Sequence, residues 1–239
     1  MNFKKCIEVL VFATLVAVGS ASAACSNGTL NGVWGFWAGA AVGQFTADGK
    51  GNITAGSETV SSNGTISTQT FTGTYSVATS CTGHITIKIT HGGSVTANFV
   101  LDQMNKGVQI IDTVSGFNGS GIGAAEGTVT CGLTGQKVTF AALLFGKYPS
   151  TNTKVDYVVQ FILDGHGHVT GSGTFDVGGT ITSTAISGTY TESSNCTGTT
   201  AIKAGTSTLN FNFVVVAAGK EAFVIQTNNG TAIAGFMQQ

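Results

Sequence analysis

An internal duplication constrains this chain more than any other feature of its sequence. The segment 45–54 (FTADGKGNIT) matches 161–170 (FILDGHGHVT). Three shorter blocks repeat in the same order: Gly73–Tyr75 matches Gly188–Tyr190, Cys81–Gly83 matches Cys196–Gly198, and Asn98–Val100 matches Asn212–Val214. Because the offset drifts only from 116 to 114 residues, the blocks form one continuous duplication. The fold must therefore build one kind of unit twice.

Both copies have the pattern of antiparallel strands. Short segments rich in Val, Ile, Thr, Phe and Tyr are punctuated by glycine, Asn-Gly and Asp-Gly, which favour hairpin turns because glycine tolerates positive φ. Residues 85–90 alternate between apolar and polar side chains, as a half-buried strand does. In the first copy we expect eight strands, near residues 33–40, 42–48, 51–59, 65–78, 83–91, 94–103, 107–114 and 121–130. Little helix is expected.

Short links favour pairing between neighbours in the sequence, and eight strands can close into a barrel without exposed edges. We therefore predict an all-β fold of two tandem antiparallel meander barrels, over residues 24–130 and 131–239. Two open sandwiches, or one barrel assembled from both copies, are the alternatives. The second copy has about ten extra residues before its first matching block, and 146–153, which contains the only proline, is predicted as a longer surface loop.

The first 23 residues have the order of a secretory signal peptide. Lysines at positions 4 and 5 precede an apolar run over 9–18, and residues 21–23 (ASA) form an A-x-A cleavage site. The apolar run falls well short of the roughly 20 residues that a membrane-spanning helix needs. We expect cleavage after residue 23, and a secreted, periplasmic or cell-surface protein.

The charge pattern argues against several classes of partner. Only 9% of the residues are charged and the chain has no arginine, so it lacks the bidentate donor that favours phosphate and carboxylate ligands. Without residues 1–23 the net charge is near −2, and no basic face for nucleic acid is indicated. Since 42% of the residues are hydrophobic and 15 are Phe, the chain has enough apolar residues to form a core. Nucleic acid and anionic ligands are disfavoured, and no cofactor is indicated.

Four cysteines follow the predicted cleavage site and form two equivalent pairs. In an oxidising compartment they indicate disulfides. Three pairings are possible, and the duplication favours Cys25 with Cys81 and Cys131 with Cys196. Each bridge would tie the first strand of a copy to its mid-copy turn. A metal or redox site is the alternative, but the C-x-x-C spacing is missing.

The repeated Asp-Gly-x-Gly segment has the chemistry of a calcium loop only in part. Asp48 and Asn52 offer oxygens at positions one and five, but Thr59 stands at the twelfth position, where an EF-hand has glutamate. A hairpin turn with a bulge explains the segment more simply.

In the second copy the same segment contains the candidate transition-metal ligands Asp164, His166 and His168. Histidines two apart on a strand point to the same face, and with a neighbouring carboxylate they suit Zn or Cu. A complete site needs a further ligand that the sequence does not supply, and polar residues in an exposed turn are the alternative.

No catalytic constellation is evident in the sequence. The chain lacks the G-x-S-x-G, H-E-x-x-H and P-loop patterns. Its carboxylates are scattered, and Asp102, Asp112 and Asp156 would have to converge from distant strands to act together. Since the copies share turn glycines, core aromatics and cysteines, we assign no catalytic and no cofactor-binding residue.

The shared residues resemble those of uncharacterised exported bacterial β-rich repeat proteins. The matching segments here are Cys25 with Leu30–Trp34, Phe45–Gly51, Gly73–Tyr75 and Cys81–Gly83. This resemblance implies no activity. The G-x-W of 32–34 is similar to that of the calycins, the lipocalin and avidin barrels, in which the Trp packs near the closed end. Lipocalins set a late basic residue, typically Arg, against this Trp, and this chain has no Arg.

Together these patterns predict an exported, non-enzymatic binding or surface-interaction module. Its partner would be a small neutral or apolar ligand, since an eight-stranded barrel can hold one small molecule, or another surface component. One alternative is a secreted hydrolase with an unrecognised site. The other is an outer-membrane β-barrel, which needs strands of about 9 to 11 residues and aromatic girdles. With only four Tyr and two Trp in the chain, membrane insertion is not expected.

Overall fold

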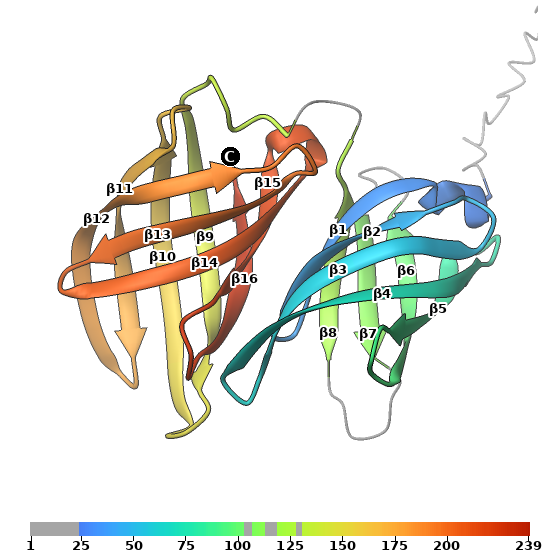
Figure 1. Cartoon of the computed structure of the whole chain (residues 1–239), viewed down its shortest axis with the longest axis horizontal. Coiled ribbons are helices and arrows are strands. Elements are labelled where there is room, and N and C mark those ends of the chain that lie inside the picture. Colours follow the sequence, from blue (N-terminus) through green and yellow to red (C-terminus); the bar gives the residue numbers. More distant parts are fainter. Residues whose placement is uncertain (1–23, 103–106, 113–118, 128–130) are drawn as a thin grey trace, which may run out of the picture.

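The chain forms two closed eight-stranded barrels, one after the other (Figure 1). The computed structural model describes residues 24–102, 107–112, 119–127 and 131–239, so the predicted signal peptide lies outside the described residues. Strands β1–β8 close an antiparallel meander that we call barrel 1, and β9–β16 close a second, barrel 2. The predicted architecture is confirmed, and the alternatives of two sandwiches or one shared barrel are wrong.

Barrel 1 consists of β1 (Gly32–Ala38), β2 (Ala41–Ala47), β3 (Asn52–Ser62), β4 (Thr65–Val77), β5 (Thr82–Ile89), β6 (Ser94–Asp102), β7 (Gly107–Asp112) and β8 (Ser120–Ala125). Barrel 2 consists of β9 (Val138–Tyr148), β10 (Thr153–Leu163), β11 (His168–Val177), β12 (Thr180–Glu192), β13 (Thr197–Ala204), β14 (Ser207–Val216), β15 (Glu221–Gln226) and β16 (Ala232–Gln238). Two short 3-10 helices, η1 (Asn27–Leu30) and η2 (Ala217–Gly219), are the only helices of the described residues.

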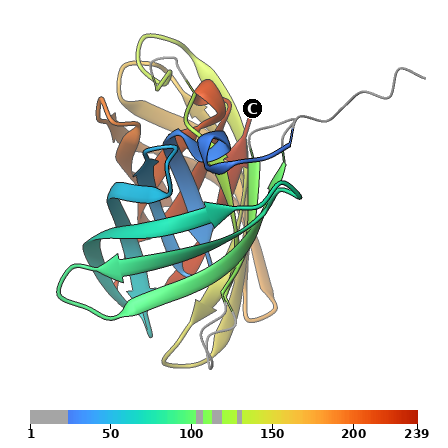
Figure 2. The same cartoon turned by 90° about the vertical axis from the view of Figure 1, so that its right-hand side faces the viewer.

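Each barrel closes by pairing its first strand with its last. In barrel 1, β1 pairs with β8 from Trp34↔Ala125 to Ala38↔Gly121, and in barrel 2, β9 pairs with β16. Figure 2 shows the molecule with barrel 1 toward the viewer. Because the sheets are closed, no strand edge is left free along these ladders.

The extra residues of the second copy lengthen a hairpin. The β9–β10 ladder extends to Tyr148↔Thr153, whereas the corresponding β1–β2 ladder ends at Ala38↔Ala41. The prediction of a long surface loop at 146–153 is therefore wrong for half of this segment: residues 146–148 and 153 belong to the strands, and only 149–152 lie in the turn. Glycine and proline in this segment indicate a turn, but they do not indicate how far the strands on either side extend.

Both predicted disulfides are formed, Cys25–Cys81 and Cys131–Cys196, each with a Cα–Cα distance of 4.9 Å. One detail of the prediction is wrong, since Cys25 precedes η1 and so ties the segment before β1, not β1 itself, to the β4–β5 turn. Tyrosines reinforce the same connection in both copies. The Tyr75 hydroxyl donates to the Asn27 carbonyl at 3.1 Å, and the hydroxyl of its counterpart Tyr190 donates to the Leu133 carbonyl at 2.9 Å.

Glycines in both copies make room for aromatic rings inside the barrels. Gly83 on β5 pairs with Phe99 on β6, and the equivalent Gly198 on β13 pairs with Phe213 on β14. In each pair the ring lies against the glycine and leaves no space for a Cβ. The repeated Cys-Thr-Gly and Asn-Phe-Val blocks therefore encode one packing unit.

A third apolar cluster joins the two barrels, and we call it the barrel interface. It contains Val42 and Ala124 of barrel 1 and Val214, Val216, Phe223, Ile225 and Ala234 of barrel 2, all buried. Trp37 extends it, with its ring 5.2 Å from that of Phe145. Gly35 allows this close approach, because a Cβ there would collide with Val216 Cγ1.

Hydrogen bonds surround the barrel interface. Asn212 Nδ2 donates to Thr59 Oγ1 at 2.9 Å, and the Ser61 hydroxyl donates to the Thr231 carbonyl at 2.5 Å. The Gly230 amide donates to the Gly64 carbonyl at 2.8 Å. The two barrels therefore meet through an apolar centre and a hydrogen-bonded rim, as a stable protein interface does.

Candidate functional site

The candidate metal ligands of barrel 2 are held by their own turn. Asp164 Oδ1 accepts hydrogen bonds from the amides of His166 at 2.7 Å and His168 at 3.0 Å. Asp164 Oδ2 lies 2.9 Å from His168 Nδ1, and His166 Nδ1 lies 3.0 Å from the Asp164 carbonyl oxygen. His166 sits in the turn before β11, so the expectation that both rings share one face of a strand does not apply.

The equivalent turn in barrel 1 has the same geometry without histidine. Asp48 Oδ1 accepts from the amides of Lys50 and Asn52, and Asn52 Nδ2 donates to Asp48 Oδ2 at 2.7 Å. The Asn52 side chain, followed by the backbone donors, lowers the pKa of Asp48 to about 2. Backbone donors, led by the His166 amide, lower the pKa of Asp164 to about 2 as well. The repeated carboxylate thus satisfies its own turn.

Across the described residues, no three His, Cys, Asp or Glu side chains gather into a group that could hold a metal ion. The carboxylates considered for catalysis lie far apart in the topology: Asp102 ends β6 of barrel 1, whereas Asp156 lies on β10 of barrel 2. The side chain of Asp112 lies outside the described part. Asp156 instead faces Asp176 across the β10–β11 ladder, in a shallow hollow beside the β9–β10 turn.

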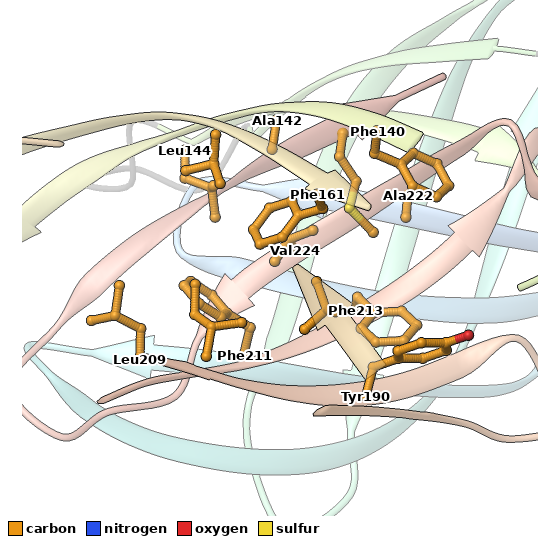
Figure 3. Packing of buried hydrophobic residues seen from close by; sticks show 14 of the residues in the cluster. Phe140, Ala142, Leu144, Phe161, Tyr190, Leu209, Phe211, Phe213, Ala222 and Val224 are labelled. Atoms are coloured by element: carbon orange, nitrogen blue, oxygen red, sulfur yellow. The ribbon is translucent and has the colours of Figure 1, made fainter. Parts of the chain in front are cut away.

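The two barrel interiors differ much more than their turns do. In barrel 2, large apolar side chains fill the interior, as Figure 3 shows for Phe140, Phe161, Phe211 and Phe213. Phe140 and Leu144 are completely buried. Such packing resembles a protein core and leaves little room for a guest.

Barrel 1 has small residues at matching positions. The strand registers align Ala38 with Leu144, Ala41 with Tyr157, Gly43 with Val159, Val60 with Phe175 and Ala97 with Phe211. All five pairs lie in the half of each barrel toward the β1–β2, β3–β4 and β5–β6 turns or their counterparts. In the same half, barrel 1 has the larger side chain at Phe36, aligned with Ala142, and at Phe71, aligned with Ile186.

Solvent reaches this half of barrel 1. The barrel 2 residues Leu144, Tyr157, Val159, Phe175 and Phe211 are all at most 6% exposed. Their counterparts Ala38, Ala41 and Val60 are only half-buried, although they point inward. Gly43 and Ala97 are buried, so solvent reaches the barrel 1 interior at Ala38, Ala41 and Val60.

A polar pair lies inside the open half of barrel 1. Glu58 on β3 pairs across the ladder with Gln69 on β4, and Gln69 Nε2 donates to Glu58 Oε1 at 2.6 Å. Glu58 points inward because strand side chains alternate and its neighbour Thr59 faces barrel 2. A Cβ on the inward-facing Gly43 would also lie 2.6 Å from Glu58 Cβ. Barrel 2 has Gly173 and Thr184 at these two positions.

Burial raises the pKa of Glu58, and the hydrogen bond from Gln69 only partly opposes this shift. We call the region formed by Glu58, Gln69, Ala38, Gly43 and Ala97 the Glu58 site. It combines a carboxyl and an amide with small apolar walls.

Aromatic rings separate the Glu58 site from the disulfide end. The Phe36 ring lies 6.2 Å from that of Phe45 and 6.1 Å from that of Phe71. Beyond these rings, Trp34 is buried and its indole donates to the Leu30 carbonyl of η1 at 2.8 Å. Barrel 1 therefore has one end closed by η1, the disulfide and aromatic packing, and another half with smaller side chains than barrel 2 has.

Two further hollows lie outside the barrels. A cleft of about 220 Å³ between them is lined mainly by hydroxyl groups, including Ser57, Thr59 and Thr68 of barrel 1 and Thr191, Thr197 and Thr199 of barrel 2. A shallow groove of similar size runs over β12–β14. Gly43 and Glu58 also line the cleft between the barrels, although strand alternation turns the Glu58 side chain into barrel 1.

Glu126 forms a second buried polar cluster, at the barrel interface. It is 8% exposed, and burial raises its pKa to about 7. The Gln44 side-chain amide, oriented with its nitrogen toward Glu126, donates to Glu126 Oε1 at 2.9 Å and to the Asn195 carbonyl at 2.8 Å. The Glu126 carbonyl also accepts from the Ala218 amide. This cluster connects the barrels through a carboxyl whose pKa is raised by burial.

Sequence reasoning missed both Glu58 and the barrel interface. A signal for Glu58 was present, because a carboxylate at an inward position of an amphipathic strand is unusual. A signal for the interface was the run 213–218 (FVVVAA), which is apolar on both faces of its strand, as buried strands are.

Comparisons with known proteins do not indicate a function for the Glu58 site. No family model matches the sequence, and no curated protein or solved structure matches the chain. Neither helix within the described ranges has the length and apolar character that a membrane crossing requires.

Proposed function

We propose that this protein is a non-enzymatic binding protein whose ligand site is the Glu58 site inside barrel 1. The observation that carries the proposal is the contrast at equivalent positions: Ala38, Gly43 and Ala97 replace the fully packed Leu144, Val159 and Phe211. Losing so much side-chain volume would destabilise a core by several kcal/mol, about 2 to 5 for each large-to-small change. Small side chains at these positions in barrel 1 alone therefore favour a ligand that takes the place of the barrel 2 side chains.

The chemistry of the Glu58 site favours a small ligand with an apolar body and one hydrogen-bonding group. The aromatic rings and alanines offer apolar contact, while Glu58 and Gln69 offer an acceptor and a donor. A hydroxyl, amide or amine suits this pair. An anion does not, because it would lie beside Glu58 with no arginine in the chain to balance it.

The same geometry favours binding over hydrolysis. Carboxylate-based hydrolysis of a glycoside needs two carboxyl groups about 5 to 10 Å apart, whereas Glu58 is paired with the amide of Gln69. The apolar interiors and hydroxyl-rich exteriors of both barrels also support a role in water over one in an outer membrane, where a barrel has an apolar exterior. Export remains the proposed route, because two disulfides suit an oxidising compartment.

A neutral solvatochromic dye tests the proposal. We expect saturable binding with a blue shift, weakened at least about tenfold by Ala97→Phe, which gives barrel 1 the residue that barrel 2 carries in Phe211. Because barrel 1 carries Phe36 and Phe71 where barrel 2 has Ala142 and Ile186, circular dichroism and urea unfolding must show that the variant is folded. Glu58→Gln should weaken an amine probe more than the neutral dye.

Ala185→Phe is the matched control, since it adds the same ring at an exposed position outside barrel 2. It should leave dye affinity unchanged. Equal affinity of wild type and Ala97→Phe, with both shown to be folded by circular dichroism, would contradict the proposal.

A further inference from the structure

The barrel interface joins two different faces of one repeated unit. Face A is the outer surface of the first two strands, and in barrel 1 it presents Gly35, Trp37 and Val42. Face B is the outer surface of the last three strands, and in barrel 2 it presents Val214, Ile225 and Phe236. These two faces pack against each other. Because the contact pairs unlike faces, it is heterologous.

Duplication gives each barrel a copy of both faces. The strand registers place Ala141, Leu143 and Val158 of barrel 2 at the positions of face A, and we call this surface A′. They place Val100 and Ile111 of barrel 1 at the positions of Val214 and Ile225 on face B, and we call this surface B′. Among the described residues, Val100, Ile111, Leu143 and Val158 lie outside the interface cluster, whereas Ile122, the counterpart of Phe236, already packs against it.

Both unmatched surfaces carry exposed apolar side chains. Leu143 and Val158 of A′ are 40% and 62% exposed, and Val100 and Ile111 of B′ are 50% and 59% exposed. Four of the seven exposed large hydrophobic residues among the described residues are thus counterparts of interface residues, of which Val42, Val214 and Ile225 are buried and Trp37 is half-buried. Their counterparts Val42 and Val214 are 3% and 4% exposed.

We infer that a second copy of this chain docks on these surfaces, with A′ of one molecule against B′ of the next. The contact would repeat the arrangement that joins barrel 1 to barrel 2. It continues an interface that the molecule already builds, and it covers the apolar side chains left exposed by that interface. Since unlike faces meet, association proceeds head to tail and yields a ring where the rotation closes, or an open chain where it does not.

Differences between the surfaces make this contact weaker than the barrel interface. B′ has Asp102 where face B has Val216, and Gln109 where face B has Phe223. A′ has Ala141 where face A has Gly35, whose missing Cβ permits the close packing onto Val216. We therefore expect association that is reversible and rises with protein concentration.

Sedimentation velocity over a wide concentration range tests the inference on the full mature chain. Wild-type protein should show a concentration-dependent shift to larger species. Val158→Lys on A′ and Ile111→Lys on B′ should each weaken association at least about tenfold, because each places a charge in an apolar contact. Ile181→Lys is the control, since Ile181 is 68% exposed but lies on neither surface.

Mixing the two variants distinguishes head-to-tail docking from any symmetric contact. Val158→Lys retains an intact B′, and Ile111→Lys retains an intact A′, so an equimolar mixture should form 1:1 complexes that grow no further. A wild type that stays monomeric at every concentration would overturn the inference. So would a mixture that fails to associate, or an Ile181→Lys variant as impaired as the other two. Dye binding at the Glu58 site serves as an independent check that each variant is folded.

Discussion

Barrel 1 and barrel 2 share their scaffold and differ in what fills it. Both fasten an opening segment with a disulfide and a tyrosine, and both cap a turn with an aspartate. Inside, however, barrel 2 is packed by Phe211 and Val159 where barrel 1 has Ala97 and Gly43. The shared residues lie at turns and at the ends of the barrels. Inward-facing positions such as Ala97 and Gly43 can therefore differ between the copies without a change of fold.

The outer surfaces of the two barrels also differ at equivalent positions. Strands β14 and β15 are buried on both faces where they meet barrel 1, whereas the equivalent β6 alternates between buried and exposed residues. One face of the repeated unit thus became a permanent contact in one copy and stayed open in the other.

Removal of the disulfides is the strongest way to test whether the shared scaffold is equivalent in both copies. Cys25→Ala with Cys81→Ala, and Cys131→Ala with Cys196→Ala, should each lower the free energy of unfolding by about 4 kcal/mol in the chain-entropy model. The bridges close loops of similar size, with sequence separations of 56 and 65. Denaturant unfolding measures both losses, and a large loss in one copy with none in the other would break the equivalence.

Opening barrel 2 sharpens the comparison of the interiors. Phe211→Ala gives barrel 2 the residue that barrel 1 has in Ala97, and it should cost about 3 to 5 kcal/mol because Phe211 is 2% exposed and closely packed. The reverse change, Ala97→Phe, should cost less, since no side chain is removed and barrel 1 has small residues at Ala38 and Gly43 in the same half. Equal costs for the two changes, measured by urea unfolding, would show that the interiors are packed alike.

Protonation of the buried carboxyls should have a smaller effect on the free energy of unfolding. Burial raises the pKa of Glu126 from 4.5 to about 7, so the folded state binds this proton more tightly than the unfolded chain. The resulting stability is present below pH 4.5 and is lost as the pH rises to 7. Allowing for partial solvent screening, we expect a loss of about 1 to 2 kcal/mol. The pKa values of Glu58 and Glu192 are also raised by burial, with the same sign.

Glu126→Gln is the matched variant, because its amide keeps the shape and the contact with Gln44 while losing the titration. Its thermal midpoint should change less between pH 4.5 and 7 than that of the wild type. A wild-type midpoint that rises over this interval, or an unchanged slope in the variant, would contradict the assignment.

Much of the fold was predictable because its determinants are local. Asp-Gly and Asn-Gly mark the turns, alternation marks the strands, and the duplication selects the Cys25–Cys81 pairing. The Glu58 site was not predictable in this way, since it depends on which residues face each other across strands. Ala97 and Phe211 look like ordinary strand residues until the register aligns them. The 146–153 prediction failed for the same reason, because strand length is set by the partner strand.

The central claim is that barrel 1 holds a ligand where barrel 2 holds side chains. Methyl NMR with a small apolar alcohol as the probe tests this claim, because both barrel interiors contain methyl groups and can be compared in one experiment. We expect saturable shift changes at Ala38, Ala97 and Val60, and none at Leu144 and Val159 of barrel 2. Changes centred on barrel 2, or spread equally over both interiors, would contradict it.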